Sequence, residues 1–240
     1  MAEFDAFADS YRDIIDRSLR PFGFETTYFA RYKARYIFDH VVSQAPKKIL
    51  DFGCGVGLLA SYLKACFPTS NVHGFDSSGS SIDAARRDFA SVGYFSSDPY
   101  DLDSDYGLIL LSNVLHHVGS NEMEGIFKGL WKRLDKSGKI VVFEQNPINP
   151  FTRWVFSRNP LDANATLLKL RRVRSLLDRS GFECLRQDYI VFFPSFLRRL
   201  IHIEKLLFRC PLGAQYTLVG KKKANHNRPF GPADMLEASH

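Results

Sequence analysis

The sequence predicts a doubly wound α/β fold built on a mostly parallel, seven-stranded sheet. Short apolar runs of strand length alternate with segments of helical periodicity along most of the chain. Residues 106–114 (YGLILLSNV) are apolar almost throughout, as expected for a central parallel strand. A glycine-rich stretch, residues 49–59 (ILDFGCGVGLL), directly follows the first apolar run. Sheets of this kind bind ligands at the carboxyl ends of their strands.

Composition supports one large globular unit. The chain has 240 residues, 45% of them hydrophobic, and a net charge of +6, which weakly favours anionic partners such as nucleic acid or a membrane surface. The four cysteines form no CxxC pair, so we expect reduced thiols. Neither a signal peptide nor an apolar run of about 18 residues is seen, so we expect a cytoplasmic protein.

The first half of the chain reads as two helices followed by alternating strands and helices. Apolar residues recur at helical spacing in residues 4–20, and Pro21 and Gly23 separate this helix from a second one over 26–44. The predicted strands that follow are 47–50, 71–76, 93–97, 106–114 and 139–145. The predicted helices between them are 58–67, 81–90 and 119–134.

The second half closes the sheet with two more strands. Residues 147–160 (PINPFTRWVFSRNP) are bounded by prolines, and we expect an irregular insertion. The elements predicted after it are a helix over 167–182, a strand over 183–193, a helix over 195–209 and a strand over 214–221. The polar tail from about Lys222 is expected to be disordered.

The glycine spacing argues against a phosphate ligand. A dinucleotide loop needs G-x-G-x-x-G, but the third glycine, Gly57, comes one position early. A P-loop needs a lysine after its glycines, and none follows here. The pattern that fits is D-x-G-x-G-x-G beginning at Asp51, whose carboxylate would repel a phosphate and suits a cationic ligand.

A second acid, Asp76, ends the second predicted strand in VHGFD. A carboxylate at this position can accept hydrogen bonds from the two hydroxyls of a ribose, and the alternative is a helix N-cap. Taken together, Asp51 and Asp76 favour an adenosine that carries positive charge. S-adenosylmethionine, with its sulfonium and ammonium groups, has this chemistry.

Four stretches in order now resemble a class I S-adenosylmethionine-dependent methyltransferase of the small-molecule, ubiquinone-biosynthesis type. They are ILDFGCGVG, VHGFDSS, DPYDLDSDYGLILLSNVLHHV and LDKSGKIVVFEQ, and the start, FDAFADSY, resembles the helical cap of such enzymes. Gly107 departs from the family, which often has Asp there. The resemblance implies a Rossmann-like methyltransferase domain over 1–221, divided into a cap (1–44), a cofactor-binding core (45–145), an acceptor-side insertion (146–166) and a C-terminal part (167–221), before the tail (222–240).

The resemblance also implies a set of cofactor-binding residues. These are Tyr11, Asp51, Gly53, Cys54, Gly55, Asp76, Ser77, Asp98, Pro99 and Asn113. Asp98 and Pro99 would lie against the adenine and Asn113 against the methionine part. Tyr11 would either close over the cofactor or serve only in helix packing.

Catalysis is expected to be direct displacement of the methyl group, aided mainly by alignment of the reactants. His116, His117 and Glu144 are the catalytic candidates; their alternatives are holding the loop or pairing with an arginine. Adjacent histidines on a helix point about 100° apart, and a metal pair prefers i, i+4 spacing, so we expect no metal. The acceptor-binding candidates are Asn146, Asn149, Arg153 and Trp154, with an ordinary structured loop as the alternative.

We expect a small-molecule or lipid-linked acceptor. Residues 195–209 predict a basic amphipathic helix with a cationic stripe at Arg198, His202, Lys205 and Arg209, which suits peripheral contact with a membrane. The alternative is ordinary packing of its apolar face on the domain. A nucleic-acid substrate is disfavoured because the fourth strand ends in SNVLHH rather than an N-P-P-Y type motif. A nicotinamide enzyme is disfavoured by the glycine spacing, and a non-catalytic S-adenosylmethionine-binding module stays an alternative.

Overall fold

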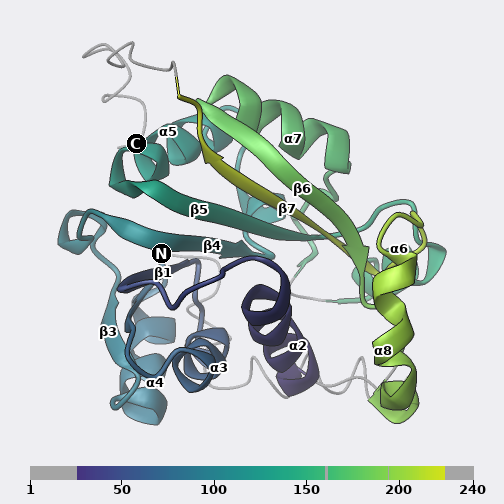
Figure 1. Cartoon of the computed structure of the whole chain (residues 1–240), viewed down its shortest axis with the longest axis horizontal. Coiled ribbons are helices and arrows are strands. Elements are labelled where there is room, and N and C mark those ends of the chain that lie inside the picture. Colours follow the sequence, from purple (N-terminus) through teal and green to yellow (C-terminus); the bar gives the residue numbers. More distant parts are fainter. Residues whose placement is uncertain (1–25, 160–161, 194, 225–240) are drawn as a thin grey trace.

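The computed structural model describes residues 26–159, 162–193 and 195–224 and contains one seven-stranded sheet (Figure 1). Its strand order is β3-β2-β1-β4-β5-β7-β6, with β7 antiparallel to both of its neighbours and the other pairs parallel. The predicted fold class is confirmed. The strands are β1 Lys48–Phe52, β2 Asn71–Phe75, β3 Gly93–Ser96, β4 Tyr106–Ser112, β5 Leu134–Gln145, β6 Phe182–Ile190 and β7 Gln215–Lys222.

Helices cover both faces of this sheet. One face carries α2 Thr26–His40, α3 Leu58–Cys66 and α4 Gly79–Phe89, and the other carries α5 Met123–Arg133 and α7 Leu170–Arg179 (Figure 1). Two shorter helices, α6 Pro150–Phe156 and α8 Ile201–Glu204, lie at the edge of the molecule near the end of β6 (Figure 1). The predicted helix over 4–20, Tyr11 and most of the predicted tail fall outside the described residues.

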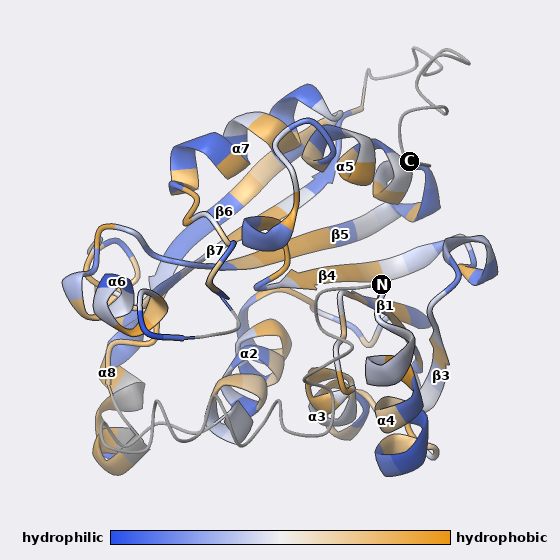
Figure 2. Ribbon diagram, turned by 180° about the vertical axis from the view of Figure 1, so that it is seen from behind, coloured by the Kyte–Doolittle hydropathy of each residue, from blue (hydrophilic) through white to orange (hydrophobic). Residues whose placement is uncertain are grey.

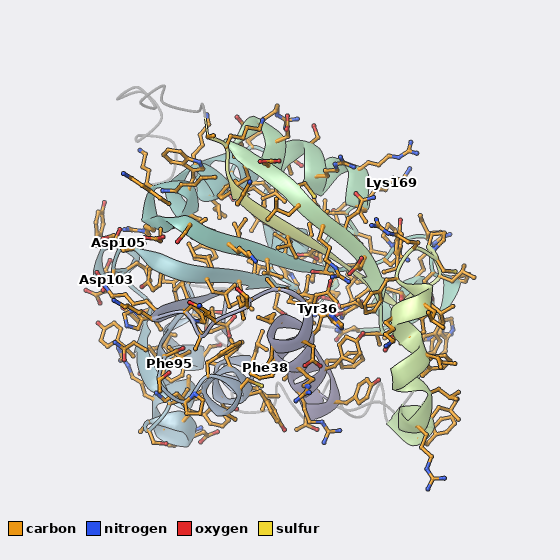
Figure 3. The ribbon with its side chains drawn as sticks, viewed as in Figure 1. Tyr36, Phe38, Phe95, Asp103, Asp105 and Lys169 are labelled. Carbon is orange, nitrogen blue, oxygen red and sulfur yellow. The ribbon has the colours of Figure 1, made fainter. Side chains whose placement is uncertain are left out.

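Side-chain alternation along the central strands fills two cores. Leu108 and Leu110 of β4 pack in the core beneath α2 and α3, whereas Ile109 and Leu111 pack in the core beneath α5 and α7. Each fully buried side chain of this size stabilises the fold by about 1.5–3 kcal/mol. Tyr36 projects from α2 toward the sheet (Figure 3), with its ring centroid 5.9 Å from that of Phe143.

The sheet has its topological switch point between β1 and β4. From β1 the chain winds outward through β2 to β3, then returns to β4 and winds the other way. The connections leaving β1 and β4 therefore diverge to opposite faces, which opens a crevice at the carboxyl ends of these two strands. This is where the predicted glycine loop lies.

The prediction of an irregular segment over 147–160 was wrong in its middle, where α6 forms. The side chain of Asn149 accepts a hydrogen bond from the Thr152 backbone N–H at 2.9 Å, and Pro150 occupies the first turn. Both residues are favoured at a helix start. The sequence analysis took the bounding prolines as a sign of irregular structure and did not consider that Pro150 fits the first turn of a helix.

The prediction of one continuous helix over 195–209 was also wrong. The segment consists of two short 3₁₀ stretches, Ser195–Leu200 and Lys205–Leu207, on either side of the single turn of α8, with non-helical angles at Leu197. Glu204 is buried and accepts a hydrogen bond from the Phe192 backbone N–H at 2.6 Å. This contact fixes the segment to the chain that precedes it.

None of the helices in the described part of the chain has the length and apolar character needed to cross a bilayer.

Candidate active site

A cavity of about 500 Å³ lies at the switch point of the sheet. Its walls come from the end of β1 and the glycine loop, the end of β2, the loop after β4, and the N-terminal half of α2. Seven of the predicted cofactor residues line it, six of them in or next to the first two strand ends: Asp51, Gly53, Cys54, Gly55, Asp76 and Ser77. Asn113 lines it as well.

The glycine loop exposes backbone atoms to the cavity, with no side chain in front of them. Gly53 has φ 77°, and a Cβ atom there would lie 2.3 Å from Cγ2 of Val114. Gly55 has φ 50°, and a Cβ there would meet nothing within 4 Å. Positive φ is available to glycine at little cost, so these residues allow a tight turn with an open face toward a ligand.

Asp76 lines the cavity and is not the cap of helix α4. Its carboxylate accepts hydrogen bonds from the backbone N–H groups of Gly55 at 2.8 Å and Ser78 at 3.0 Å. The cap of α4 is Ser78, whose hydroxyl accepts from the Ser81 backbone N–H. Each carboxylate oxygen has a further lone pair, so Asp76 retains capacity to accept hydrogen bonds in the cavity.

Asp51 is the least satisfied charged group among the described residues. It is fully buried, lines the cavity, and neither carboxylate oxygen has a hydrogen-bond partner within the described chain. Burial raises its pKa to about 7, with Lys33 opposing this rise and Asp76 adding to it. A buried acid without donors is costly, so this site fits a ligand that supplies a cation or N–H donors.

Lys33 faces the same cavity from α2 and was missed by the sequence analysis. It is buried, and its ammonium donates to the Ser112 hydroxyl at 2.8 Å. Burial lowers its pKa to about 8, and Glu144 and Asp51 oppose this change. The signal was present in the sequence: Lys33 interrupts the apolar stripe Ala30, Ala34 and Ile37 at helical spacing.

Asn113 has a strained backbone at the end of β4. Its φ is 59°, a region that non-glycine residues rarely adopt, at a cost of about 1–3 kcal/mol. Its backbone N–H donates to the Phe143 carbonyl, while its side-chain oxygen is buried without a hydrogen-bond partner in the described chain. Strain together with an unpaired acceptor is typical of a ligand-binding position.

Glu144 does not reach the cavity, so its predicted role as a catalytic or acceptor-binding residue was wrong. It is fully buried, and one oxygen accepts the backbone N–H groups of Val114 and Leu115 while the other lies 2.6 Å from Nδ1 of His116. The charge of Glu144 is therefore used to hold the loop after β4.

His116 is likewise a structural residue. Its imidazole is buried between Glu144 and Asp162, with Nε2 3.5 Å from Oδ1 of Asp162. Burial alone would lower its pKa, but the two carboxylates outweigh this and raise it to about 9. His116 is therefore protonated at neutral pH, which disfavours a role as general base.

His117 is the histidine that lines the cavity. Residues 115–117 form a 3₁₀ turn, and despite the expected angular divergence its ring lies against that of His116, with centroids 4.2 Å apart. Its Nε2 is also 3.5 Å from Oδ1 of Asp162.

The two histidines and Asp162 form a possible metal-binding cluster. One ligand atom from each lies within 4.8 Å of the others. The sequence analysis could not foresee this cluster, because Asp162 comes from a distant loop. The ion pair of protonated His116 with its two carboxylates accounts for the same geometry, and the absence of a metal stays a prediction.

Asp98 and Pro99 lie away from the cavity. Both are exposed, and the Asp98 carboxylate accepts the Tyr100 backbone N–H at 2.8 Å, so it caps the 3₁₀ turn Pro99–Asp101. Neither belongs to the cavity lining, and the structure gives no support for their predicted contact with adenine.

The four predicted acceptor residues do not line the cavity either. Asn146 is buried and donates to the Pro211 and Gly213 carbonyls, and Asn149 caps α6. Arg153 and Trp154 are exposed on α6. The structure gives no support for these predicted acceptor contacts, since Asn146 and Asn149 fix this segment to residues 211–213 and α2 supplies a wall of the cavity instead.

A seven-stranded sheet of this order, with an acid-lined glycine loop at its switch point, defines a class I S-adenosylmethionine-dependent methyltransferase. The chain belongs to the methyltransferase-domain family, whose sequence model matches residues 26–187.

Individual relatives agree with this assignment. Demethylmenaquinone methyltransferase of Thermotoga maritima is 25% identical over 162 residues, covering 65% of this chain and 67% of that enzyme. Trans-aconitate 2-methyltransferase of Pseudomonas paraeruginosa is 37% identical over 62 residues, which span 25% of this chain and only 22% of that enzyme. A solved methyltransferase from Archaeoglobus fulgidus shares the fold, with a TM-score of 0.65 at 14% identity, covering 89% of this chain and all of that one.

Proposed function

We propose that this enzyme transfers the methyl group of S-adenosylmethionine to a small organic acceptor bound in the cavity beneath α2. One observation carries the proposal. The cavity contains a buried acid, Asp51, without hydrogen-bond donors in the described chain, and a buried lysine, Lys33, which reaches it from α2. A ligand with an ammonium and a carboxylate on one carbon complements such a pair, and the methionine part of the cofactor has both.

Different residues bind different parts of the cofactor. Asp51 receives the ammonium group and Lys33 the carboxylate, so that both buried charges gain a partner. Asp76 accepts hydrogen bonds from the ribose hydroxyls. The rings of Phe52 and Phe75, stacked with centroids 4.9 Å apart, give the cavity an apolar wall.

The sulfonium supplies a good leaving group when the cofactor is bound. A bond forms between the acceptor nucleophile and the methyl carbon, and the electron pair of the broken carbon–sulfur bond stays on sulfur. The chain's share is to align the acceptor and exclude water, which is worth up to about 7–11 kcal/mol. His117 takes the proton from an acceptor hydroxyl or amine, since histidines titrate near neutral pH.

The acceptor side of the cavity is formed by Thr26, Phe29 and Ala30 of α2. A wall with one aromatic ring and one hydroxyl fits the reacting part of a partly apolar acceptor. The two relatives are named for small organic acceptors, trans-aconitate and demethylmenaquinone, which supports the same substrate class.

Titration with S-adenosylhomocysteine tests the cofactor assignments. Asp76→Ala removes charge-assisted hydrogen bonds of about 1.5–3 kcal/mol each, so affinity should fall at least tenfold while the circular dichroism spectrum is unchanged. Lys33→Met, which is nearly isosteric, should weaken binding by a similar factor. Asp103→Ala, an exposed acid paired with Lys48, is the matched control and should have no effect. Unchanged affinity in both Asp76→Ala and Lys33→Met would refute the proposed arrangement.

A further inference from the structure

Exposed apolar side chains are concentrated on one edge of the molecule. In the part of the chain that the structure describes, eight of the twelve large hydrophobic side chains that are exposed fall in two short segments. They are Ile148, Trp154, Phe196, Leu197, Leu200, Ile203, Leu206 and Leu212, with Leu206 78% and Phe196 71% exposed. Figure 2 shows the apolar colour along the α8 segment at this edge.

These two segments form a single surface, which we call the edge face and define as residues 148–158 and 195–212. The side chain of Asn149 donates to the Leu212 carbonyl at 2.6 Å, and that of Asn146 donates to the Pro211 carbonyl at 2.9 Å. Both views of the ribbon place α6 and α8 at the same side of the molecule (Figures 1 and 2).

The exposed charged side chains of the edge face, within the described chain, are all cationic. Its exposed charged residues within the described chain are Arg153, Arg158, Arg199, Lys205 and Arg209. The sole acid in these two segments, Glu204, is buried. The guanidinium of Arg158 lies 4.2 Å from the centroid of the Trp154 ring, so cationic and aromatic groups are interleaved. An apolar surface with cations around it complements the headgroup region of an anionic bilayer.

The edge face adjoins the cavity through α2. The rings of Tyr36 on α2 and Phe208 in the edge face lie 5.7 Å apart, and the Tyr28 hydroxyl donates at 2.9 Å to the carbonyl of Phe193, just before the second segment of that face. Neighbouring positions on the same helix, Phe29 and Lys33, line the cavity. One helix thus separates the edge face from the site of methyl transfer.

We propose that the edge face docks on an anionic membrane surface and that the acceptor enters the cavity from that surface as a lipid-linked molecule. The second half of this inference rests on the proposed methyl transfer; the docking itself does not. A second copy of the chain is a poorer occupant, because pairing two edge faces would bring their cations together and like charges repel.

Vesicle co-sedimentation of the full chain tests the docking. We expect binding to phosphatidylcholine vesicles that contain 30% phosphatidylglycerol, weak binding to pure phosphatidylcholine, and loss of binding as salt rises. Arg199→Glu/Lys205→Glu/Arg209→Glu should reduce binding to the anionic vesicles at least tenfold, since each cation near the surface contributes about fivefold. Phe196→Ser/Leu206→Ser should reduce it by a similar factor.

Matched controls separate a local surface from net charge and general hydrophobicity. Lys47→Glu/Lys136→Glu/Arg171→Glu changes the net charge equally away from the edge face, and Tyr100→Ser/Leu185→Ser removes exposed apolar side chains elsewhere. Both control variants should bind vesicles like the wild type. Equal losses in test and control variants would overturn the proposal, as would the absence of binding at low salt.

Self-association is the competing outcome and is measured on the same samples. A wild-type dimer that Phe196→Ser/Leu206→Ser dissociates, without vesicle binding, would assign the edge face to a second copy and overturn membrane docking. S-adenosylhomocysteine affinity, measured without vesicles, reports on the methyltransferase site alone. A failure of docking is therefore distinguishable from a failure of the proposed function.

Discussion

At the scale of single residues, the proposed function of this enzyme depends most on the buried pair of Lys33 and Asp51. A charge inside a protein is costly unless it is paired, and these two side chains influence each other's pKa but form no hydrogen bond with each other in the described chain. We infer that these two buried charges are retained because a bound ligand can pair with both of them. Both groups titrate close to neutral pH in the ligand-free protein, which makes binding sensitive to pH.

Cofactor affinity should fall as the solution becomes acidic. The pKa of Asp51 is raised from 3.8 to about 7, so the folded protein favours its protonated form; the stability that this contributes is complete below about pH 4 and is lost progressively as pH rises to about 7. A cationic ligand needs the ionised form, so affinity should drop about tenfold per pH unit below 7. The neighbouring charges of Lys33 and Asp76 do not reverse the upward direction of this pKa shift.

Calorimetric titration between pH 5.5 and 7.5 measures this effect. Asp51→Asn should remove the pH dependence, whatever its effect on absolute affinity. A flat profile in the wild type would show that Asp51 does not face the ligand's cation.

Substitutions of His116 and His117 should have clearly different effects. His117→Ala should lower turnover by about 10²–10⁴-fold with little change in cofactor affinity, because a general base is lost. His116→Ala leaves the buried Glu144 and the half-buried Asp162 without their cation and should destabilise the fold by about 3–5 kcal/mol. Turnover and thermal unfolding of both variants measure this. Equal, small effects on turnover would leave alignment as the whole catalytic mechanism.

At the scale of elements, the strands and the helices on the sheet could be predicted from the sequence, and the edge segments could not. Central strands such as Tyr106–Ser112 are apolar on both faces, and helices such as Leu170–Arg179 repeat apolar residues every 3.6 positions. Residues 147–160 and 195–209 lack such a dominant pattern. Their structure depends on contacts distant in sequence, such as Asn149 with Leu212 and Phe208 with Tyr36.

The start of α6 should depend on a single side chain. Asn149→Ala removes the cap and the bond to the Leu212 carbonyl and should destabilise the protein by about 1 kcal/mol. Chemical denaturation measures this, and hydrogen exchange should show faster exchange of the Thr152 and Arg153 amides. Asn71→Ala, an exposed asparagine at the start of β2, is the control. Unchanged exchange at both amides would contradict the assigned cap.

At the scale of the whole molecule, the sequence located the ligand site better than it located the acceptor. Asp51, Asp76 and the glycines could be placed because strand ends in such sheets converge on one edge. Lys33 interrupts an apolar stripe in the sequence, but its place in the cavity depends on how α2 packs on the sheet, which local spacing does not encode. The same holds for Asp162, which reaches the two histidines from a separate loop.

The cluster of His116, His117 and Asp162 is either an ion-paired cluster or a metal centre, and the dependence of turnover on a metal ion distinguishes the two. We expect dialysis against EDTA to leave turnover within twofold of the untreated enzyme, because protonated His116 already satisfies both carboxylates. Activity lost to EDTA, restored by Zn²⁺ and absent in Asp162→Asn would instead establish a metal site at His116, His117 and Asp162.

The central claim is that the cavity at the switch point holds the adenosyl and methionine parts of S-adenosylmethionine. Isothermal titration of the wild-type chain with S-adenosylmethionine, S-adenosylhomocysteine and NAD tests it most directly. The account predicts one site for each of the first two ligands, weakened by Asp76→Ala, and no heat of binding with NAD. Binding of NAD with no response to S-adenosylmethionine or its product would contradict the account.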